Sequence, residues 1–123
     1  MNHYEQLKMK LANCQPIVMS NLMVTASPLL IGALTASDCV LIDKEHGIYG
    51  TEELIPMTMQ CRHLQFPSIV RVEDSLYHLI AKAIDLGADG IMLPRVERME
   101  QVAAAVEALS LIHISEPTRL DVI

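Results

Sequence analysis

Positive charge is in short supply in this chain. Nine lysines and arginines are set against fifteen acidic residues, which gives a formal net charge of −6. Nucleic acid backbones are bound by clustered basic side chains, so this balance argues against a nucleic acid partner. The first eight residues also lack the apolar core of a secretory signal, and we expect none to be present.

Cysteine is equally scarce. Cys14, Cys39 and Cys61 are odd in number, widely spaced and set among apolar neighbours. Disulfide frameworks and zinc sites need paired cysteines at short or regular spacings. We therefore expect three buried free thiols in a reducing compartment, and a cytoplasmic protein.

Charged residues are absent from residues 17–37, a stretch long enough to raise the question of a membrane span. Polar side chains and Gly32 interrupt this stretch. Ser27 followed by Pro28 is typical of a helix start, with serine as N-cap and proline at the first helical position. We interpret the stretch as a strand, a turn and a helix, and expect no membrane partner.

The chain does contain a regular alternation of elements. After a short helix expected at residues 4–13, apolar strands are predicted near residues 17–19, 39–42, 68–72 and 90–93, with helical patterns between them. Such alternation implies a parallel sheet, either doubly wound or part of a barrel. No Gly-x-Gly-x-x-Gly follows the first strand, and barrel units average about 31 residues. We favour an α/β fold, the N-terminal half of a (β/α)8 TIM barrel with about four βα units.

Local signals place the helices more closely. A helix should open at Thr51, with two glutamates in its first turn where they complement the helix dipole. The next should follow Asp74 as N-cap and stop at Gly87. Helical spacing predicts one apolar stripe on each helix, the kind of stripe that usually faces a core. These stripes comprise Leu76, Leu79, Ile80, Ala83 and Ile84 in that helix and Met99, Val102, Ala103 and Val106 in the following one.

Polar side chains gather where the second predicted strand ends. Alternation along the strand puts Leu41, Asp43 and Glu45 on one face. His46 lies three residues after Asp43, so a carboxylate could orient its imidazole for general base chemistry. A histidine in a loop can equally be structural or solvated, and both readings stay open here.

The third predicted strand carries one arginine, Arg71, in an otherwise apolar run. A buried guanidinium without a partner would be costly. It is either an anion clamp that grips a carboxylate with its planar fork, or an ion pair with Asp43 or Glu45 that closes the end of the barrel. We favour the clamp because acids, imidazole and guanidinium converge.

Several of these stretches together resemble one known family, the HpcH/HpaI metal-dependent class II pyruvate aldolases. The matching segments are SPL at residues 27–29, VLID at 40–43, EHG at 45–47, VRV at 70–72 and DLGADGIMLPRVE at 85–97. Each is weak alone, but they occur in the family's order and spacing. The resemblance implies a (β/α)8 barrel in a homo-oligomer that cleaves 4-hydroxy-2-oxo acids into pyruvate and an aldehyde.

The resemblance also implies roles for particular residues. His46 would be the general acid/base, Arg71 would stabilise the enolate of pyruvate, and Asp85 would raise the basicity of the histidine, with Asp43 and Glu45 in the same site. The family uses a divalent cation, for which we expect magnesium or manganese. Its ligands, a glutamate and an aspartate from later strands, would lie beyond residue 108, so no metal ligand is assigned here.

Asp85 requires a separate explanation. It closes a predicted helix, and helix ends in a barrel lie at the face opposite the site. We therefore expect a neighbouring subunit to supply Asp85 to His46. The alternative is an exposed aspartate paired with Lys82.

The segment LSLIHISEPTR that begins at Leu109 resembles a translated sequencing adapter. We accordingly expect residues 1–108 to form a partial barrel domain, residues 109–123 to be a non-native tail, and the chain alone to be inactive.

Two departures from the family leave the substrate subgroup open: no tryptophan is present in the first strand, and Ile48 and Tyr49 follow the Glu-His-Gly. The alternatives are a citrate-lyase-type barrel lyase acting on acyl-coenzyme A, and a non-catalytic assembly module whose charges form a structural network.

Overall fold

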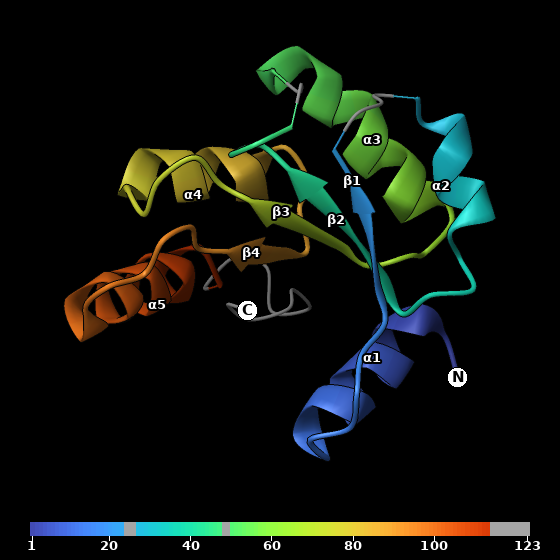
Figure 1. The fold of residues 1–123 in the computed structure, drawn as a ribbon, viewed down its shortest axis with the longest axis horizontal. Coiled ribbons are helices and arrows are strands. Elements are labelled where there is room, and N and C mark those ends of the chain that lie inside the picture. The colour runs from blue at the N-terminus through green and yellow to red at the C-terminus, as the bar shows by residue number, and fades with distance from the viewer. Residues whose placement is uncertain (24–26, 48–49, 114–123) are drawn as a thin grey trace.

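The computed structural model describes residues 1–23, 27–47 and 50–113. In these residues helices and strands alternate in the order predicted from the sequence (Figure 1). The elements are α1 (His3–Ala12), β1 (Met19–Leu22), α2 (Leu29–Ala33), β2 (Cys39–Asp43), α3 (Thr51–His63), β3 (Ser68–Arg71), α4 (Tyr77–Asp85), β4 (Gly90–Met92) and α5 (Met99–His113).

The four strands form one parallel sheet in sequence order, β1-β2-β3-β4. Parallel neighbours need a crossover connection, and the helices between the strands supply it. The register places Asp43, the last residue of β2, directly beside Arg71, the last residue of β3. The predicted alternation of strand and helix is confirmed, and the two polar strand ends are adjacent.

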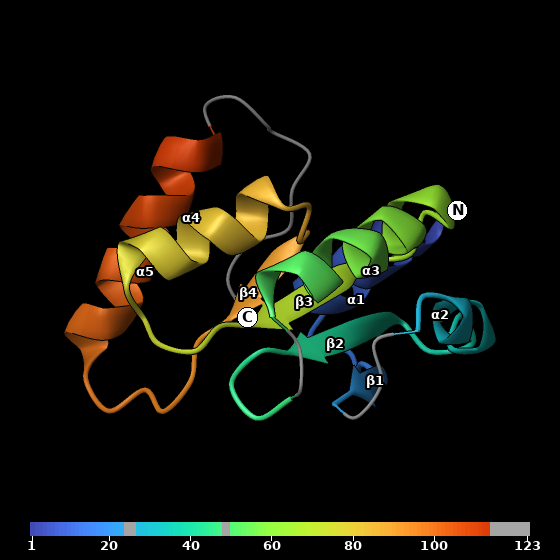
Figure 2. The ribbon, with the colours of Figure 1, turned by 90° about the horizontal axis from the view of Figure 1, so that it is seen from above.

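The two faces of the sheet bury different partners. Val40, Ile42, Val70 and Ile91 pack against the helices that follow the strands, and Figure 2 shows α3 and α4 along this face. Cys39, Leu41 and Ile69 point to the other face, where they pack with Leu7 of α1. This is the side-chain alternation expected of a strand buried on both sides.

Helix α1 lies across the amino ends of the strands (Figure 1). The Tyr4 hydroxyl donates to the buried Asp89 carboxylate at 3.2 Å, and Lys10 pairs with Asp38 at 2.7 Å. Asp89 also accepts the backbone N–H of Ser68 at 3.0 Å. Burial raises the pKa of both Asp89 and Tyr4. These contacts hold α1 against the amino end of the sheet, which is opposite the strand ends that carry Asp43 and Arg71.

The start of β1 differs from the prediction. The strand begins at Met19, two residues later than expected, because both backbone groups of Val18 are bound by Asp38. Its N–H donates to the Asp38 carboxylate at 2.8 Å, and its carbonyl accepts from the Asp38 N–H at 2.8 Å. Asp38 thus sets the point at which ladder pairing begins.

Two of the predicted N-caps are wrong. Helix α2 is capped by Pro28 and not by Ser27, with Leu29 as its first residue and no side-chain cap. Helix α4 is capped by Leu76 and not by Asp74. The Asp74 carboxylate is used by the adjacent Ser75 N–H at 2.7 Å, which holds the preceding segment in a bend.

The predictions for α3 and for the end of α4 are confirmed. Helix α3 opens at Thr51, and Glu53 reaches back to accept the N–H of Gly50 at 3.0 Å. Helix α4 ends at Asp85, and Gly87 follows with a φ of 110°, a conformation that favours glycine.

The apolar stripe predicted for α5 is exposed and not buried. Met99 is 77% and Val106 49% exposed, whereas the buried face of the helix carries Ala105, Ala108 and Leu109. Both sets have helical spacing, so periodicity alone cannot choose between them. The exposed stripe forms a shallow apolar surface with Glu100 and Glu107 at its edge.

One of the three cysteines also departs from expectation. All are free thiols, but Cys14 is exposed, at a positive φ of 51° just after α1. Cys39 and Cys61 are buried as predicted, and burial raises their pKa to about 11 and about 12. Such thiols are inert packing groups.

The expected non-native tail begins inside α5. The helix continues past residue 108 to His113, and Leu109 packs in the core. Residues 114–123 lie outside the described part of the chain. The domain boundary at residue 108 therefore stays a prediction.

Within residues 1–23, 27–47 and 50–113, no helix combines the length and the apolar character needed to cross a bilayer. The charge-free stretch that raised the question contains β1 and α2.

The open sheet edges predict how the chain behaves in isolation. Among the described strands β1 pairs only with β2 and β4 only with β3, and α5 exposes its apolar stripe. Unpaired edges and wet apolar surface promote self-association. We expect the 123-residue chain to aggregate or to lack a cooperative melt, as measured by light scattering and thermal circular dichroism. A sharp two-state melt of a monomer would contradict this.

Candidate active site at the carboxyl ends of the strands

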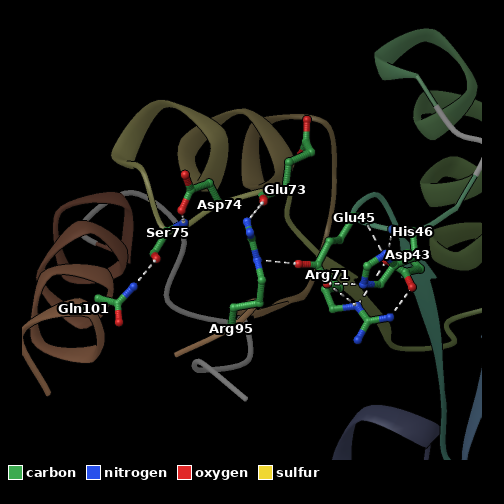
Figure 3. A network of polar contacts seen from close by, with 9 residues as sticks. All are labelled: Asp43, Glu45, His46, Arg71, Glu73, Asp74, Ser75, Arg95 and Gln101. Carbon is green, nitrogen blue, oxygen red and sulfur yellow. Dashed lines mark hydrogen bonds and ion pairs between the residues drawn. The ribbon is translucent and has the colours of Figure 1, made fainter. Parts of the chain in front are cut away.

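An ion pair joins the carboxyl ends of β2 and β3 (Figure 3). Arg71 Nε donates to Asp43 Oδ1 at 3.1 Å, and Arg71 Nη2 donates to Asp43 Oδ2. Asp43 is fully buried, whereas the Arg71 side chain keeps 25% exposure. The hydrogen bond from Arg71 holds the pKa of Asp43 below its usual range. The ion-pair alternative for Arg71 is thus present in the geometry, and the Arg71 side chain stays partly exposed.

The Asp43 carboxylate also shapes the chain after β2. Its Oδ1 accepts the backbone N–H groups of Glu45 at 2.9 Å and His46 at 3.0 Å. An aspartate that bonds the backbone two or three residues ahead forms a tight turn. The turn brings Glu45 and His46 to the same side, although in an extended chain they would point apart.

Glu45 lies at the centre of the charged residues. Its Oε1 is 3.0 Å from His46 Nε2 and 3.7 Å from Arg71 Nε, and its Oε2 is 3.0 Å from Arg95 Nε. The Glu45 side chain is only 9% exposed. Among the described residues no donor is aligned for a hydrogen bond to Oε2, so the Arg95 contact is an ion pair without a directed hydrogen bond.

Two further contacts continue the network. Arg95 Nη2 donates to the Glu73 carbonyl at 3.3 Å, and Lys44 Nζ lies 3.5 Å from Glu73 Oε2. Figure 3 shows Arg95 between Glu73 and Glu45, with Arg71 on the other side of Glu45. Segments after β2, β3 and β4 therefore meet at the carboxyl end of the sheet, which we call the mouth.

Most of the predicted site residues come together here. His46 and Arg71 lie at the same mouth and share Glu45 as a neighbour. The carboxylate that touches the imidazole is Glu45, because Asp43 holds only the His46 backbone. Sequence reasoning did not single out Arg95. Its place in the segment after β4 was a usable signal, because β2 and β3 also end in charged residues.

Asp85 is not part of this group. It is exposed at the end of α4, next to the loop that leads into the amino end of β4. That end of the sheet is opposite the mouth. Among the described residues no ion pair of Asp85 with Lys82 is found. Supply of Asp85 by a neighbouring subunit stays a prediction.

The described residues do not form a metal site by themselves. None of their histidines, cysteines and carboxylates gather in a group of three or more that could hold an ion. Asp43 is occupied by Arg71 and two backbone N–H groups, which leaves Glu45 Oε2 as a buried carboxylate oxygen without a directed donor. One such oxygen is not enough for magnesium or manganese.

Comparison with known proteins decides the family. Residues 23–118 match the HpcH/HpaI aldolase/citrate lyase family. The chain belongs to this family. The match extends over the whole mouth and over β2, β3 and β4, so the HpcH/HpaI assignment rests on the same residues as the site.

Individual proteins of the HpcH/HpaI family are also similar to this chain. The chain is 39% identical over 74 residues to the 2-dehydro-3,6-dideoxy-6-sulfogluconate aldolase of Pseudomonas putida, a match that covers 58% of this chain and 28% of the relative. It superimposes on a HpcH/HpaI aldolase/citrate lyase family protein from Burkholderia cenocepacia with a TM-score of 0.73 and 27% identity, covering 84% of this chain and 42% of the other.

A third similarity is to the citrate synthase SbnG, with a TM-score of 0.68 and 32% identity over 81% of this chain and 41% of that structure. The chain thus spans about two-fifths of the length of these solved relatives. The predicted fold class is confirmed: four βα units that form part of a TIM-barrel-like fold.

The buried ion pair leads to a stability prediction for a polypeptide extended to the full length of its relatives. Asp43→Ala should cost about 3–5 kcal/mol, because it leaves a guanidinium and two backbone N–H groups without their acceptor. Asp43→Asn should cost less, since its carbonyl oxygen can still accept the two N–H groups. Urea unfolding measures both. Glu107→Ala, at an exposed glutamate on α5, should stay within about 0.5 kcal/mol; equal losses at the two positions would contradict the assignment.

The lowered pKa of Asp43 predicts a pH dependence. Ionised Asp43 stabilises the fold fully above its unfolded pKa of about 3.9, and this contribution disappears as pH falls through the lower folded value. The stability difference between the unsubstituted protein and Asp43→Asn should therefore be constant at neutral pH and shrink below about pH 4. Unfolding curves collected from pH 7 to 2 test this, and a difference that persists to pH 2 would refute it.

Proposed function

We propose that this chain supplies part of the active site of a lyase that cleaves a 4-hydroxy-2-oxo acid into pyruvate and an aldehyde. The observation that carries the proposal is the convergence of His46 and Arg71 on Glu45 at the carboxyl ends of two adjacent strands. Membership of an aldolase/lyase family supports it. In TIM barrels the carboxyl ends of the strands are where active sites lie.

His46 is proposed as the general base. Its imidazole is 60% exposed at the mouth, with Nε2 held 3.0 Å from Glu45. Cleavage requires removal of the proton from the C4 hydroxyl; the C3–C4 bond then breaks, and its electrons form the enolate of pyruvate. The nearby Glu45 carboxylate fixes the orientation of the ring.

Arg71 is proposed to receive the enolate charge. Asp43 occupies the Nε and one Nη2 hydrogen, and the remaining N–H groups can face the oxygen on which negative charge develops. Because Asp43 and the sheet hold the guanidinium in advance, it does not reorganise during the reaction. The buried pair would therefore assist catalysis by fixing the orientation of the Arg71 guanidinium.

A divalent cation, magnesium or manganese, is proposed to complete the site with ligands from strands beyond β4. When bound, it would act as a Lewis acid toward the oxygens of pyruvate. We further propose a homo-oligomer in which Asp85 of a neighbouring subunit approaches His46, and a cytoplasmic location.

The substrate class is supported by the named relative. Its substrate is a 2-dehydro sugar acid that carries a 6-sulfo group, which places a 2-oxo acid at one end and an oxyanion at the other. We propose a small 2-oxo acid of this general kind for the present chain.

Likeness to a citrate synthase favours a second candidate, a lyase of the citrate type acting on acyl-coenzyme A. A requirement for coenzyme A would distinguish it from the aldolase. A non-catalytic assembly module would show neither activity and would bind neither pyruvate nor oxamate in the presence of magnesium.

The proposal predicts the effect of His46→Ala in the extended polypeptide. Retro-aldol turnover, followed by coupling pyruvate release to lactate dehydrogenase, should fall by about 10²–10⁴-fold, because a positioned base is lost. The matched control is His78→Ala, at an exposed histidine on α4, which should retain full turnover. Unchanged pyruvate release by His46→Ala would remove the histidine from the reaction.

A further inference from the structure

Arg95 adopts a backbone conformation that its neighbours do not explain. Three non-glycine residues of the described chain have positive φ: Cys14, Gln65 and Arg95. Cys14 and Gln65 each follow the last turn of a helix, where this conformation is ordinary. Arg95, at φ 44°, follows strand β4 instead. A non-glycine residue held there is strained, and such strain is concentrated at functional sites.

The loop that carries Arg95 is anchored at both ends. Pro94 is buried immediately before it. After it, the side chain of Gln101 accepts the backbone N–H groups of Glu97 at 2.8 Å and Arg98 at 3.0 Å. The strained backbone is therefore held rigidly, and it directs the Arg95 side chain toward Glu45 and Glu73 (Figure 3).

The basic side chains at the mouth differ in how far they are already engaged by acidic partners. Arg71 is paired with Asp43, and Lys44, whose side chain is 9% exposed, contacts Glu73. Arg95 is 68% exposed and contacts Glu45 without an aligned hydrogen bond. Among Lys44, Arg71 and Arg95, the basic side chains of the described network, Arg95 is the most exposed. An incoming oxyanion could bind the N–H groups of Arg95 that the Glu73 carbonyl does not occupy.

The position of Arg95 gives it a different target from Arg71. The two guanidinium groups lie on opposite oxygens of one carboxylate, Glu45 Oε1 and Oε2. If a 2-oxo acid occupies the side of Arg71 and His46, Arg95 faces the part of the substrate several bonds away. That part becomes the aldehyde product.

We propose that Arg95 is a specificity-determining residue that binds an oxyanion, a carboxylate or a sulfonate, at the end of the substrate remote from the 2-oxo acid. This inference rests on the proposed function and adds the class of aldehyde. The planar guanidinium donates hydrogen bonds to two oxygens side by side, an arrangement that carboxylates and sulfonates both offer.

The test compares aldehydes that differ in charge. In the extended polypeptide, addition of pyruvate to succinic semialdehyde, sulfoacetaldehyde and butanal is followed for the unsubstituted enzyme, Arg95→Gln, Arg95→Lys and Arg98→Gln. Arg98→Gln is the matched control, because it removes the same charge from the same loop. For Arg95→Gln, kcat/KM should fall at least tenfold more with an anionic aldehyde than with butanal. Arg95→Lys should restore part of the preference, and Arg98→Gln should leave it unchanged.

The outcomes separate the possible sources of the effect. Selective loss with the carboxylate alone or the sulfonate alone identifies the oxyanion. Equal losses with all three aldehydes would overturn the proposal, because Arg95 would then act only by positioning Glu45. Calorimetry with glutarate, and with butyrate as control, needs no turnover: Arg95→Gln should weaken glutarate binding at least fivefold, and an equal affinity overturns the proposal. An enzyme that binds glutarate through Arg95 but adds pyruvate to no aldehyde would refute the proposed function and not this inference.

Discussion

The mouth of this sheet depends on the pairing of Asp43 with Arg71. The parallel register sets the two residues side by side, and the buried carboxylate then has a guanidinium to offset the cost of its charge. The same carboxylate folds the following turn through two backbone N–H groups. One side chain therefore fixes both the orientation of Arg71 and the positions of Glu45 and His46.

The amino and carboxyl ends of the sheet have different roles. At the amino end, α1 covers the sheet, and the buried Asp89 takes hydrogen bonds from Tyr4 and Ser68, so that polar groups there are satisfied internally. At the carboxyl end, Asp43 and Glu45 are buried, whereas the His46 and Arg95 side chains remain exposed. This division is the one expected of βα barrels, in which one face provides stability and the other carries the chemistry. Because contacts at the amino end stabilise the sheet, its carboxyl end can retain strained and partly exposed groups.

Local patterns in the sequence predicted the elements and failed where distant contacts compete. The strand positions and the end of α4 at Gly87 follow from apolar runs and backbone preference. The Asp74 cap failed because its carboxylate bonds the adjacent Ser75 instead of a helix N–H. The α5 stripe failed because two stripes share one helical period, and only packing against α4 and the core selects the face that carries Ala105 and Leu109.

By itself, the sequence determined the alternation of strands and helices, the polar strand ends and the family likeness, since all three reside in short segments. The tertiary structure alone decided which charges meet. Glu45 contacts Arg95 across fifty residues of chain, and His46 turns toward Glu45 only because Asp43 bends the backbone. Such contacts depend on strand register and on the conformation of a single residue after β4. Neither leaves a periodic trace in the order of the amino acids, because side-chain patterns report which face is buried and not which neighbour lies beside it.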